Sequence, residues 1–194
     1  MRIGIIGAGQ IGTTLSRHFA IVGHDVSLTG LLVARTVRAV ASFADVVVIA
    51  VPFHRHRELP VAELAGKPVI DATNYDPESD GCVPDLDSDR ITSSELIQAH
   101  LSGALVVKAF NAIRWEHLRD HAHRDRFAGR RGIPVSGDHV RAKKTAMALV
   151  EEIGFDAVDA GGLARGGRKF QPGTPVYAAD LTARALRARL HLAT

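Results

Sequence analysis

A glycine-rich turn close to the N-terminus constrains the fold of this chain more than any other feature. Residues 4–15 read GIIGAGQIGTTL, an apolar stretch that runs into closely spaced glycines and then into a segment with helical spacing. Arg2–Ile6 predicts a buried strand, and Leu15, Phe19 and Val22 fall on one side of the helix that follows. A strand that enters a helix through such a turn is typical of the first unit of a parallel α/β sheet.

Short apolar runs alternate with helical segments along the rest of the chain. The run Val46–Val51 is continuously apolar, as expected for a strand buried on both faces of a parallel sheet. Thr92 followed by Glu95 is a capping-box pattern and predicts the start of a helix. The remaining strands are expected near 23–29, 67–74, 104–111, 133–137 and 155–161, and further helices near 58–64, 138–153 and 181–190. This alternation predicts an α/β fold with a doubly wound, mostly parallel sheet.

The composition fits one globular domain and argues against several classes of protein. The 194 residues are 46% hydrophobic, and the longest apolar run, Val46–Val51, is far too short to span a bilayer. The single cysteine, Cys82, cannot form an intrachain disulfide, so we expect a cytoplasmic location with no signal peptide and no membrane partner. The net charge of +3 is diffuse, which suits a small anionic ligand and argues against nucleic acid.

The glycine turn has the spacing of a dinucleotide-binding fingerprint. Gly7 permits the tight turn out of the strand, Gly9 lets backbone amides approach a pyrophosphate, and Gly12 lets the helix pack closely on the sheet. The start of the helix adds free N–H groups and a partial positive charge. The alternative is a glycine turn without a ligand, but the strand before it and the helix after it favour dinucleotide binding.

The end of the second predicted strand favours NADP over NAD. NAD-binding proteins usually carry an acidic residue there, which binds the ribose 2′-hydroxyl. This chain offers Ser27, Leu28, Thr29 and Gly30 instead, so no carboxylate would repel a 2′-phosphate. No arginine stands at the strand end either, and Arg35 is the nearest.

Several sequence motifs occur together in this chain. In chain order they are GIIGAGQIG, VGHDV, ADVVVIAVP, VIDATNY, TSSELIQAHL, VVKAFNAI, GFDAVDAGGL and FQPGTPVY. With these motifs the chain resembles the NADPH-dependent coenzyme F420 (deazaflavin) reductase family, and the same module is similar to the cytosolic domain of six-transmembrane ferric reductases. This resemblance implies an NADP-binding Rossmann core at 1–115, a small C-terminal lobe at 116–194 that completes the acceptor site, and a homodimer.

The resemblance also implies which residues contact NADP and where the acceptor binds. The acceptor, a small molecule, is expected near Asn111, Ala112 and Ile113. Deazaflavin reductases often have a histidine and a proline where this chain has Asn111 and Arg114. The cofactor-binding residues implied are Gly7, Ala8, Gly9, Gln10, Ile11, Gly12, Thr29, Ala50, Val51, Pro52, Phe53, Thr73, Asn74, Asn111 and Ala112.

The activity expected from these features is hydride transfer between NADP(H) and a deazaflavin (coenzyme F420) or flavin-like acceptor. We assign no catalytic side chain, because the two cofactor rings carry such chemistry and the protein orients them. Two alternatives remain: a reductase of a small carbonyl or imine, and a protein that binds or senses NADP without turnover.

The segment after Thr29 is shorter than in the relatives that this chain resembles. They commonly continue into a Ser-Arg pair that grips the 2′-phosphate. About 40 residues separate the first strand from Val46–Val51, whereas two full βαβ units would need about 60. Either the core is shortened or a loop has been left out of the sequence. We favour the second, which predicts a Cα–Cα step well above about 3.8 Å between Thr29 and Val37, foremost from Gly30 to Leu31.

Histidine pairs raise the question of a metal. His54 and His56 are expected to be solvated residues beside the cofactor cleft. His117 and His121, four residues apart, would share a helix face, but no third ligand is evident. We therefore expect no metal site.

A few other residues keep two interpretations. Lys108 either acts as a base or is a cation that caps a strand end. Trp115 either packs within the small lobe or forms a wall of the acceptor site. The basic loop with Arg165, Arg168 and Lys169 is either solvated or an anion clamp.

Overall fold

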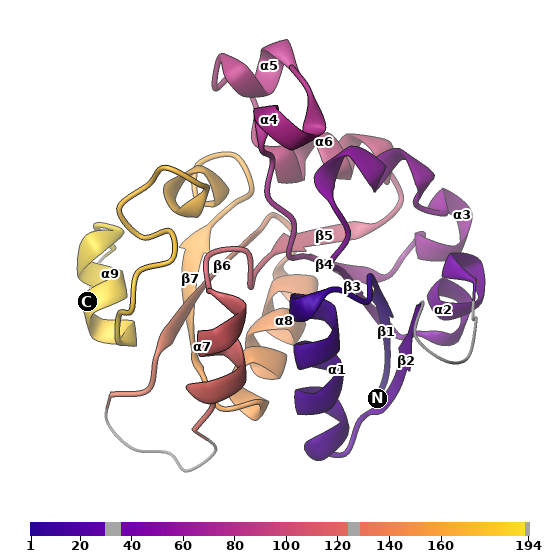
Figure 1. The fold of residues 1–194 in the computed structure, drawn as a ribbon, viewed down its shortest axis with the longest axis horizontal. Coiled ribbons are helices and arrows are strands. Elements are labelled where there is room, and N and C mark those ends of the chain that lie inside the picture. The colour runs from indigo at the N-terminus through magenta and orange to yellow at the C-terminus, as the bar shows by residue number, and fades with distance from the viewer. Residues whose placement is uncertain (30–35, 124–128, 193–194) are drawn as a thin grey trace.

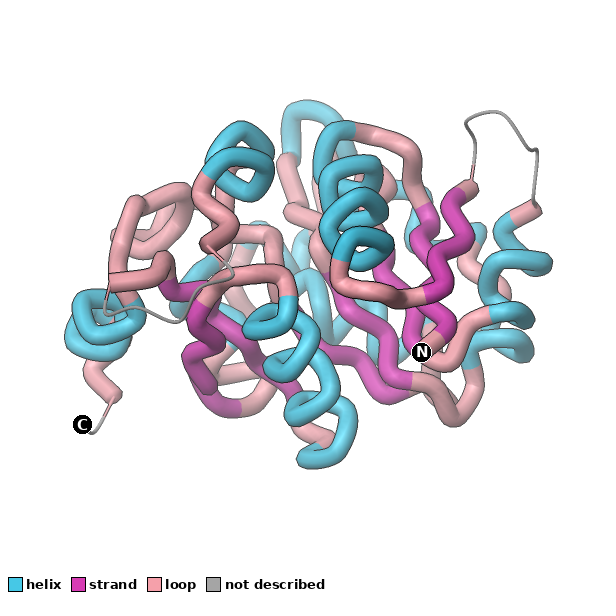
Figure 2. The backbone as a smooth tube through the Cα atoms, turned by 90° about the horizontal axis from the view of Figure 1, so that it is seen from below, coloured by secondary structure: helices cyan, strands magenta, loops and turns pink. Residues whose placement is uncertain are grey.

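The fold is a single sheet with helices on both of its faces (Figures 1 and 2). The structure is a computed structural model and describes residues 1–29, 36–123 and 129–192. Its seven strands lie in the order β2-β1-β3-β4-β5-β6-β7. The strands are β1 (Arg2–Ile6), β2 (Asp25–Leu28), β3 (Val46–Ile49), β4 (Pro68–Asp71), β5 (Leu105–Lys108), β6 (Gly132–Gly137) and β7 (Asp156–Gly161).

Helices connect the strands and build the lobe at the C-terminal end of the chain. The α-helices are α1 (Gln10–Ile21), α2 (Val37–Phe43), α3 (Val61–Leu64), α4 (Pro77–Asp80), α5 (Pro84–Asp87), α6 (Ser93–His100), α7 (Trp115–Asp120), α8 (Val140–Glu152) and α9 (Ala183–Arg189). Two 3₁₀ helices are η1 (Phe53–Glu58) and η2 (Gly167–Phe170). The capping box is present: Thr92 Oγ1 accepts from the N–H of Glu95, whose carboxylate accepts from the N–H of Thr92.

Strand directions confirm the predicted mostly parallel, doubly wound sheet. The pairs from β2 to β5 and the pair β6–β7 are parallel, and only β5–β6 is antiparallel within the described residues. Alternate residues of the strands supply two core layers. One layer joins the sheet to α1, α7 and α8, and the other joins it to α2, α3, α6 and η1. The predicted boundary at residue 115 falls inside this sheet, since β6 and β7 continue it.

The segment before β3 differs from a full Rossmann half. Residues 37–43 form helix α2, whose N-cap hydroxyl, Thr36 Oγ1, accepts from the N–H of Ala39. The helix packs tightly on β1, since a Cβ at Gly4 would lie 2.9 Å from the carbonyl oxygen of Val40. No strand among the described residues pairs with the outer edge of β2. The chain break that we expected at Gly30 lies outside the described residues.

The acidic segment 76–90 has more structure than a plain surface loop. It holds α4 and α5, which project from the body at the top of Figure 1 and leave most of their residues exposed. The lobe around α9 lies at the other end of the sheet from α2 (Figure 1). No helix in the described ranges is long and apolar enough to cross a membrane.

Candidate functional site

Two glycines of the turn after β1 are required by the fold itself. Gly7 has a φ of +122°, and a Cβ there would lie 2.2 Å from the carbonyl oxygen of Ala50. A Cβ at Gly12 would lie 1.9 Å from the carbonyl oxygen of Gly7. Both contacts involve backbone atoms, which cannot give way without moving β1, β3 or α1. Their physical roles are the ones predicted from the fingerprint.

Gly9 differs, because the described residues leave the space beside it open. A Cβ built there meets nothing within 4 Å. Gly9 is also the N-cap of α1, and no side chain of the described residues caps this end. The first N–H groups of α1 therefore lack intrahelical acceptors and face open space, together with the positive end of the helix dipole. This arrangement fits a pyrophosphate, which needs donors and close backbone approach.

Two pockets flank the glycine turn at the carboxyl ends of the strands. The β2-side pocket has a volume of about 500 Å³. The β4-side pocket has a volume of about 370 Å³ and shares Val51 with the first. The β2-side pocket is lined by Ile6, Gly7, Ala8, Thr29, Thr36, Val37, Val51, Arg55, Glu58 and Leu59. The β4-side pocket is lined by Gly9, Gln10, Ile11, Ala50, Val51, Pro52, Ala72, Thr73, Asn74, Phe110, Asn111, Ile113, Trp115 and Tyr177.

A pair of side-chain amides forms one wall of the β4-side pocket. Asn111 Nδ2 donates to Asn74 Oδ1 at 3.1 Å and to the carbonyl oxygen of Phe170 at 3.0 Å. Asn74 Nδ2 donates to the carbonyl oxygen of Asn111 at 2.9 Å and to Tyr177 Oη at 3.2 Å. These bonds connect β4, β5 and the C-terminal lobe, so both amides are held in fixed orientations.

Two buried oxygens in the same pocket are left without a partner. Asn111 Oδ1 and Thr73 Oγ1 make no hydrogen bond within the described part of the chain. Phe110, which precedes Asn111 and lines the same pocket, is 1% exposed. Its φ of +64° is a backbone conformation unfavourable for a bulky residue. Buried polar atoms without partners and strained backbone both concentrate at ligand sites.

A buried ion pair supports the pocket from below. Lys108 Nζ lies 3.4 Å from Asp71 Oδ2 and donates to the carbonyl oxygen of Thr73 at 3.2 Å. Asp71 also accepts from the N–H of Thr73 and from Ser94 Oγ. Lys108 is fully buried and does not line either pocket. This placement favours the interpretation of Lys108 as a strand-end cation over a base.

Most residues implied by the resemblance lie in one of the two pockets. Thr29 lines the β2-side pocket, and its hydroxyl accepts from the N–H of Gly7 at 2.9 Å. Phe53, Gly12 and Ala112 line neither pocket. Phe53 is instead packed in the core, where its ring stacks on His56 at 4.8 Å.

Sequence reasoning missed several lining residues. Arg55 and Glu58 lie on η1 and line the β2-side pocket, whereas only Phe53, His54 and His56 of this segment were expected at or beside the cofactor. Tyr177 comes from the C-terminal lobe, more than 60 residues beyond β5. Trp115 lines the β4-side pocket, which favours the interpretation that it borders the acceptor site.

The histidines of η1 only partly match their expectation. His54 is exposed and pairs with Asp80 at 2.9 Å. His56 was expected to be solvated, which is wrong: it is 6% exposed, and its Nδ1 lies 2.8 Å from the carbonyl oxygen of Phe53. Burial lowers the pKa of His56, so the neutral ring is favoured.

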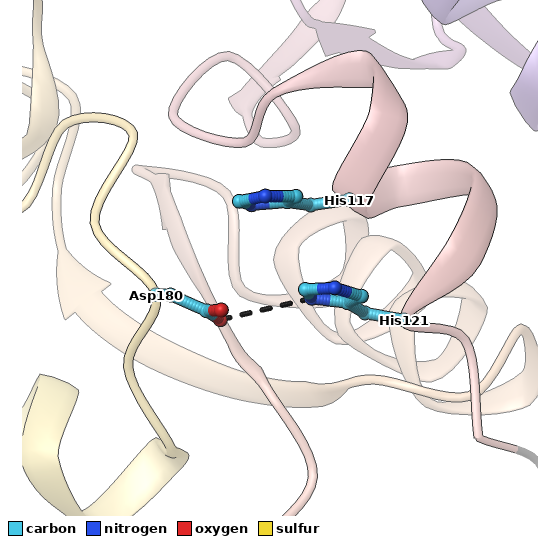
Figure 3. Close-up of side chains that lie close together, drawn as sticks. All are labelled: His117, His121 and Asp180. Carbon is cyan, nitrogen blue, oxygen red and sulfur yellow. Dashed lines mark ion pairs between the residues drawn. The ribbon is translucent and has the colours of Figure 1, made fainter.

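A third side chain of a metal-binding type lies beside His117 and His121, although none was evident from the sequence. The two rings stack at 4.4 Å on α7, and Asp180 of the C-terminal lobe lies beside them, 3.8 Å from His121 Nδ1 (Figure 3). Arg131, however, donates to Asp180 Oδ1 at 2.9 Å and lies 2.6 Å from His117 Nδ1. Arg131 is a cation bonded to two of the three side chains that could bind a metal, so its charge opposes a metal ion here. The group instead links α7 to Asp180, in the segment between β7 and α9.

The basic loop around η2 is less free than expected. Arg168 donates to the carbonyl oxygen of Asp89, and Lys169 donates to that of Leu190 at 2.9 Å. These two cations therefore tie the loop to the residues that follow α5 and α9. Arg165 is exposed.

Comparison with known proteins supports the fold and the general kind of site. No protein-family model matches the chain. A hypothetical protein of Sinorhizobium meliloti, SMa0349, has a similar structure, with a TM-score of 0.76, 28% identity, and coverage of 94% of this chain and 95% of that one. An F420-dependent NADP reductase of Arthrobacter sp. FB24 is similar at a TM-score of 0.70 and 25% identity, covering 86% and 88% of the two chains.

One curated sequence shares a shorter segment. Protein YjhV of Escherichia coli (strain K12) is 44% identical over 52 residues, which is 27% of this chain and 37% of that protein. The chain thus matches little more than a third of this relative. Taken together, the chain has the α/β fold of Rossmann-type NADP reductases, and two well-covered structural relatives share it from end to end.

Proposed function

We propose that this protein is an NADPH-dependent oxidoreductase that transfers hydride between NADP(H) and a deazaflavin or flavin-like acceptor. The observation that carries the proposal is the pair of pockets that share Val51 and lie on either side of the glycine turn, beside the uncapped start of α1 at Gly9. The first turn of α1 would hold the pyrophosphate, the β2-side pocket would hold the adenosine, and the β4-side pocket would hold the nicotinamide. The similar structure from Arthrobacter, named as an F420-dependent NADP reductase, supports the choice of acceptor.

NADPH would supply the hydride and become oxidised to NADP⁺, while the acceptor gains two electrons and takes its proton from water. The chain's own part is binding and orientation. The lining of the β4-side pocket contains amides, hydroxyls and apolar side chains, and no carboxylate or histidine within the described residues. Asn111 Oδ1 and Thr73 Oγ1 are free to bond the carboxamide of nicotinamide, which offers both a donor and an acceptor.

The position of the acceptor and the role of the C-terminal lobe are proposed from the same pocket. The acceptor ring would stack on the nicotinamide within reach of Trp115 and Tyr177. The C-terminal lobe contributes Tyr177 to this pocket, which supports the proposal that the lobe completes the acceptor site. A cytoplasmic homodimer remains part of the proposal.

A panel of acceptors tests this function. NADPH oxidation is followed by its absorbance with deazaflavin, flavin mononucleotide, a ferric chelate and a small cyclic imine. We expect turnover with one of the two ring acceptors and none with the imine. Turnover with the imine alone would support the carbonyl or imine reductase instead. Tight NADPH binding without turnover on any acceptor would support a sensing role.

A further inference from the structure

As far as the structure describes it, the end of β2 lacks the group by which related folds choose their dinucleotide. Where NAD-binding proteins place a carboxylate, the chain has Thr29. Its hydroxyl oxygen is already held by the N–H of Gly7 at 2.9 Å. Among the described residues, the choice between a ribose hydroxyl and a ribose phosphate therefore rests on another wall of the pocket.

Charged side chains enter this pocket from η1, on the wall that follows β3. Arg55 and Glu58 both line it and form an ion pair. Arg55 Nη2 donates to Glu58 Oε2 at 2.6 Å, and Nε lies 3.1 Å from both carboxylate oxygens. Arg55 Nη1 makes no hydrogen bond within the described residues. One edge of the guanidinium is thus fixed, and the two N–H groups of Nη1 remain available.

We propose that Arg55 is the residue that selects NADPH, by donating from Nη1 to the 2′-phosphate of the cofactor. This rests on the proposed function, which places the adenosine in the β2-side pocket. Arginine suits a phosphate because its planar group offers several donors to several oxygens and never loses its charge. Among the described residues that line this pocket, Arg55 is the cation.

Glu58 limits the selectivity that Arg55 can give. Its hydrogen bonds from Arg55 lower the pKa of the Glu58 carboxyl, so the group is ionised at neutral pH. The carboxylate orients Arg55, but it also repels a phosphate and competes for the same guanidinium. The pair therefore favours the phosphorylated ribose by a moderate factor, and Glu58 sets how large that factor is.

The contributions of Arg55 and Glu58 can be separated by measuring the binding of two dinucleotides to four proteins. The dissociation constants of NADPH and NADH are measured by fluorescence titration for the wild type, Arg55→Gln, Glu58→Gln and Arg57→Gln. Arg57 is the matched control, because it is exposed on the same 3₁₀ helix and lines neither pocket. Adenosine 2′,5′-bisphosphate and ADP, titrated in parallel, report the 2′-phosphate contact without the nicotinamide.

The expected readout is the ratio of the NADH to the NADPH dissociation constant. Arg55→Gln should reduce this ratio about tenfold by weakening NADPH alone, as loss of a charge-assisted bond predicts. Glu58→Gln should raise it about threefold, the scale of an exposed charge interaction. Arg57→Gln should leave it unchanged.

The outcomes distinguish this inference from the function on which it rests. If the wild type binds neither dinucleotide, the proposed function fails. If the wild type prefers NADPH and Arg55→Gln keeps the ratio, Arg55 is not the selecting residue and only this inference fails. If Arg55→Gln weakened the binding of NADPH and NADH by the same factor, the inference would also be overturned. The same holds if Arg57→Gln reduced the ratio of dissociation constants as much as Arg55→Gln does.

Discussion

The two pockets on either side of the glycine turn are built in different ways. The β4-side pocket is made from strand ends and a buried amide pair, Asn74 and Asn111, which hydrogen bonds tie to three parts of the chain. The charged wall of the β2-side pocket is a short 3₁₀ helix whose ion pair, Arg55 and Glu58, is about half exposed at 48% and 60%. The pockets therefore differ in how firmly their polar side chains are held, while residues at strand ends contribute to both.

This difference separates the reaction from the choice of cofactor. Groups that bind the reactive ring must be held within a fraction of an ångström, and burial in the sheet provides that precision. Groups that recognise the distant ribose need only charge and reach, so exposed side chains are sufficient. Changes to the amide pair Asn74 and Asn111 should therefore alter stability and rate together, while changes to Arg55 and Glu58 should alter affinity alone.

The largest effect on cofactor binding is expected at Gly9, in the glycine turn between the two pockets. Gly9→Val should reduce NADPH affinity more than about 100-fold, because its side chain occupies the space left for the pyrophosphate. Stability should fall by only about 1 kcal/mol, the cost of a poor N-cap. Isothermal titration and chemical denaturation measure the two quantities. Gly12→Ala is the contrast, since its Cβ would clash with a backbone oxygen and should destabilise the fold itself by about 3 kcal/mol.

The next effect concerns the amide pair. Asn111→Ala should destabilise the protein by about 1–3 kcal/mol, because Asn74 Oδ1 and the carbonyl oxygen of Phe170 lose their donor. It should also lower kcat/KM for NADPH at least about tenfold. Binding of ADP, which needs only the β2-side pocket, should not change. A weaker ADP affinity would show that the two pockets are coupled.

Thr73→Val should separate stability from binding within the β4-side pocket. The two side chains have similar shape, and Thr73 Oγ1 has no partner among the described residues, so its loss should leave stability unchanged or raise it by up to about 1 kcal/mol. NADPH affinity should fall about fivefold if the hydroxyl bonds the nicotinamide carboxamide. Unchanged affinity would remove Thr73 from the site.

The smallest effect is a pH dependence beneath the β2-side pocket. Because burial lowers the pKa of His56 below 6.5, folding stability from this group is complete above that pH and decreases as the pH falls. His56→Asn can keep the hydrogen bond to Phe53 without titrating. Its loss of stability between about pH 7.5 and about pH 5.5 should be smaller than that of the wild type, as measured by denaturant unfolding. Equal losses would contradict this assignment.

The sequence predicted those parts of the molecule that depend on local pattern. Gly7 and Gly12 are fixed by the strand, turn and helix that surround them, and strands such as Val46–Ile49 show as apolar runs. The α/β class and the mostly parallel sheet follow from the order of these elements and are confirmed. Positions at the strand ends, such as Thr73, could be placed at the cleft for the same reason.

The rest depends on contacts between distant segments and on backbone geometry that residue types do not reveal. Tyr177 reaches the β4-side pocket, and Asp180 reaches the pair His117 and His121. Both do so only because the lobe folds back on the sheet. Arg55 faces a pocket because residues 53–58 form a 3₁₀ helix, whereas the nearest helix expected from the sequence begins only near residue 58. The positive φ of Phe110 likewise has no signal in its residue type.

The central claim is that one dinucleotide lies across both pockets with its pyrophosphate over Gly9. A crystal structure with NADP⁺ bound tests this most directly. The account predicts pyrophosphate oxygens within hydrogen-bond distance of the first N–H groups of α1, the nicotinamide beside Asn111 and the 2′-phosphate beside Arg55. A nicotinamide more than about 10 Å from Asn111, beyond side-chain reach across a pocket, or a pyrophosphate away from Gly9, would contradict it.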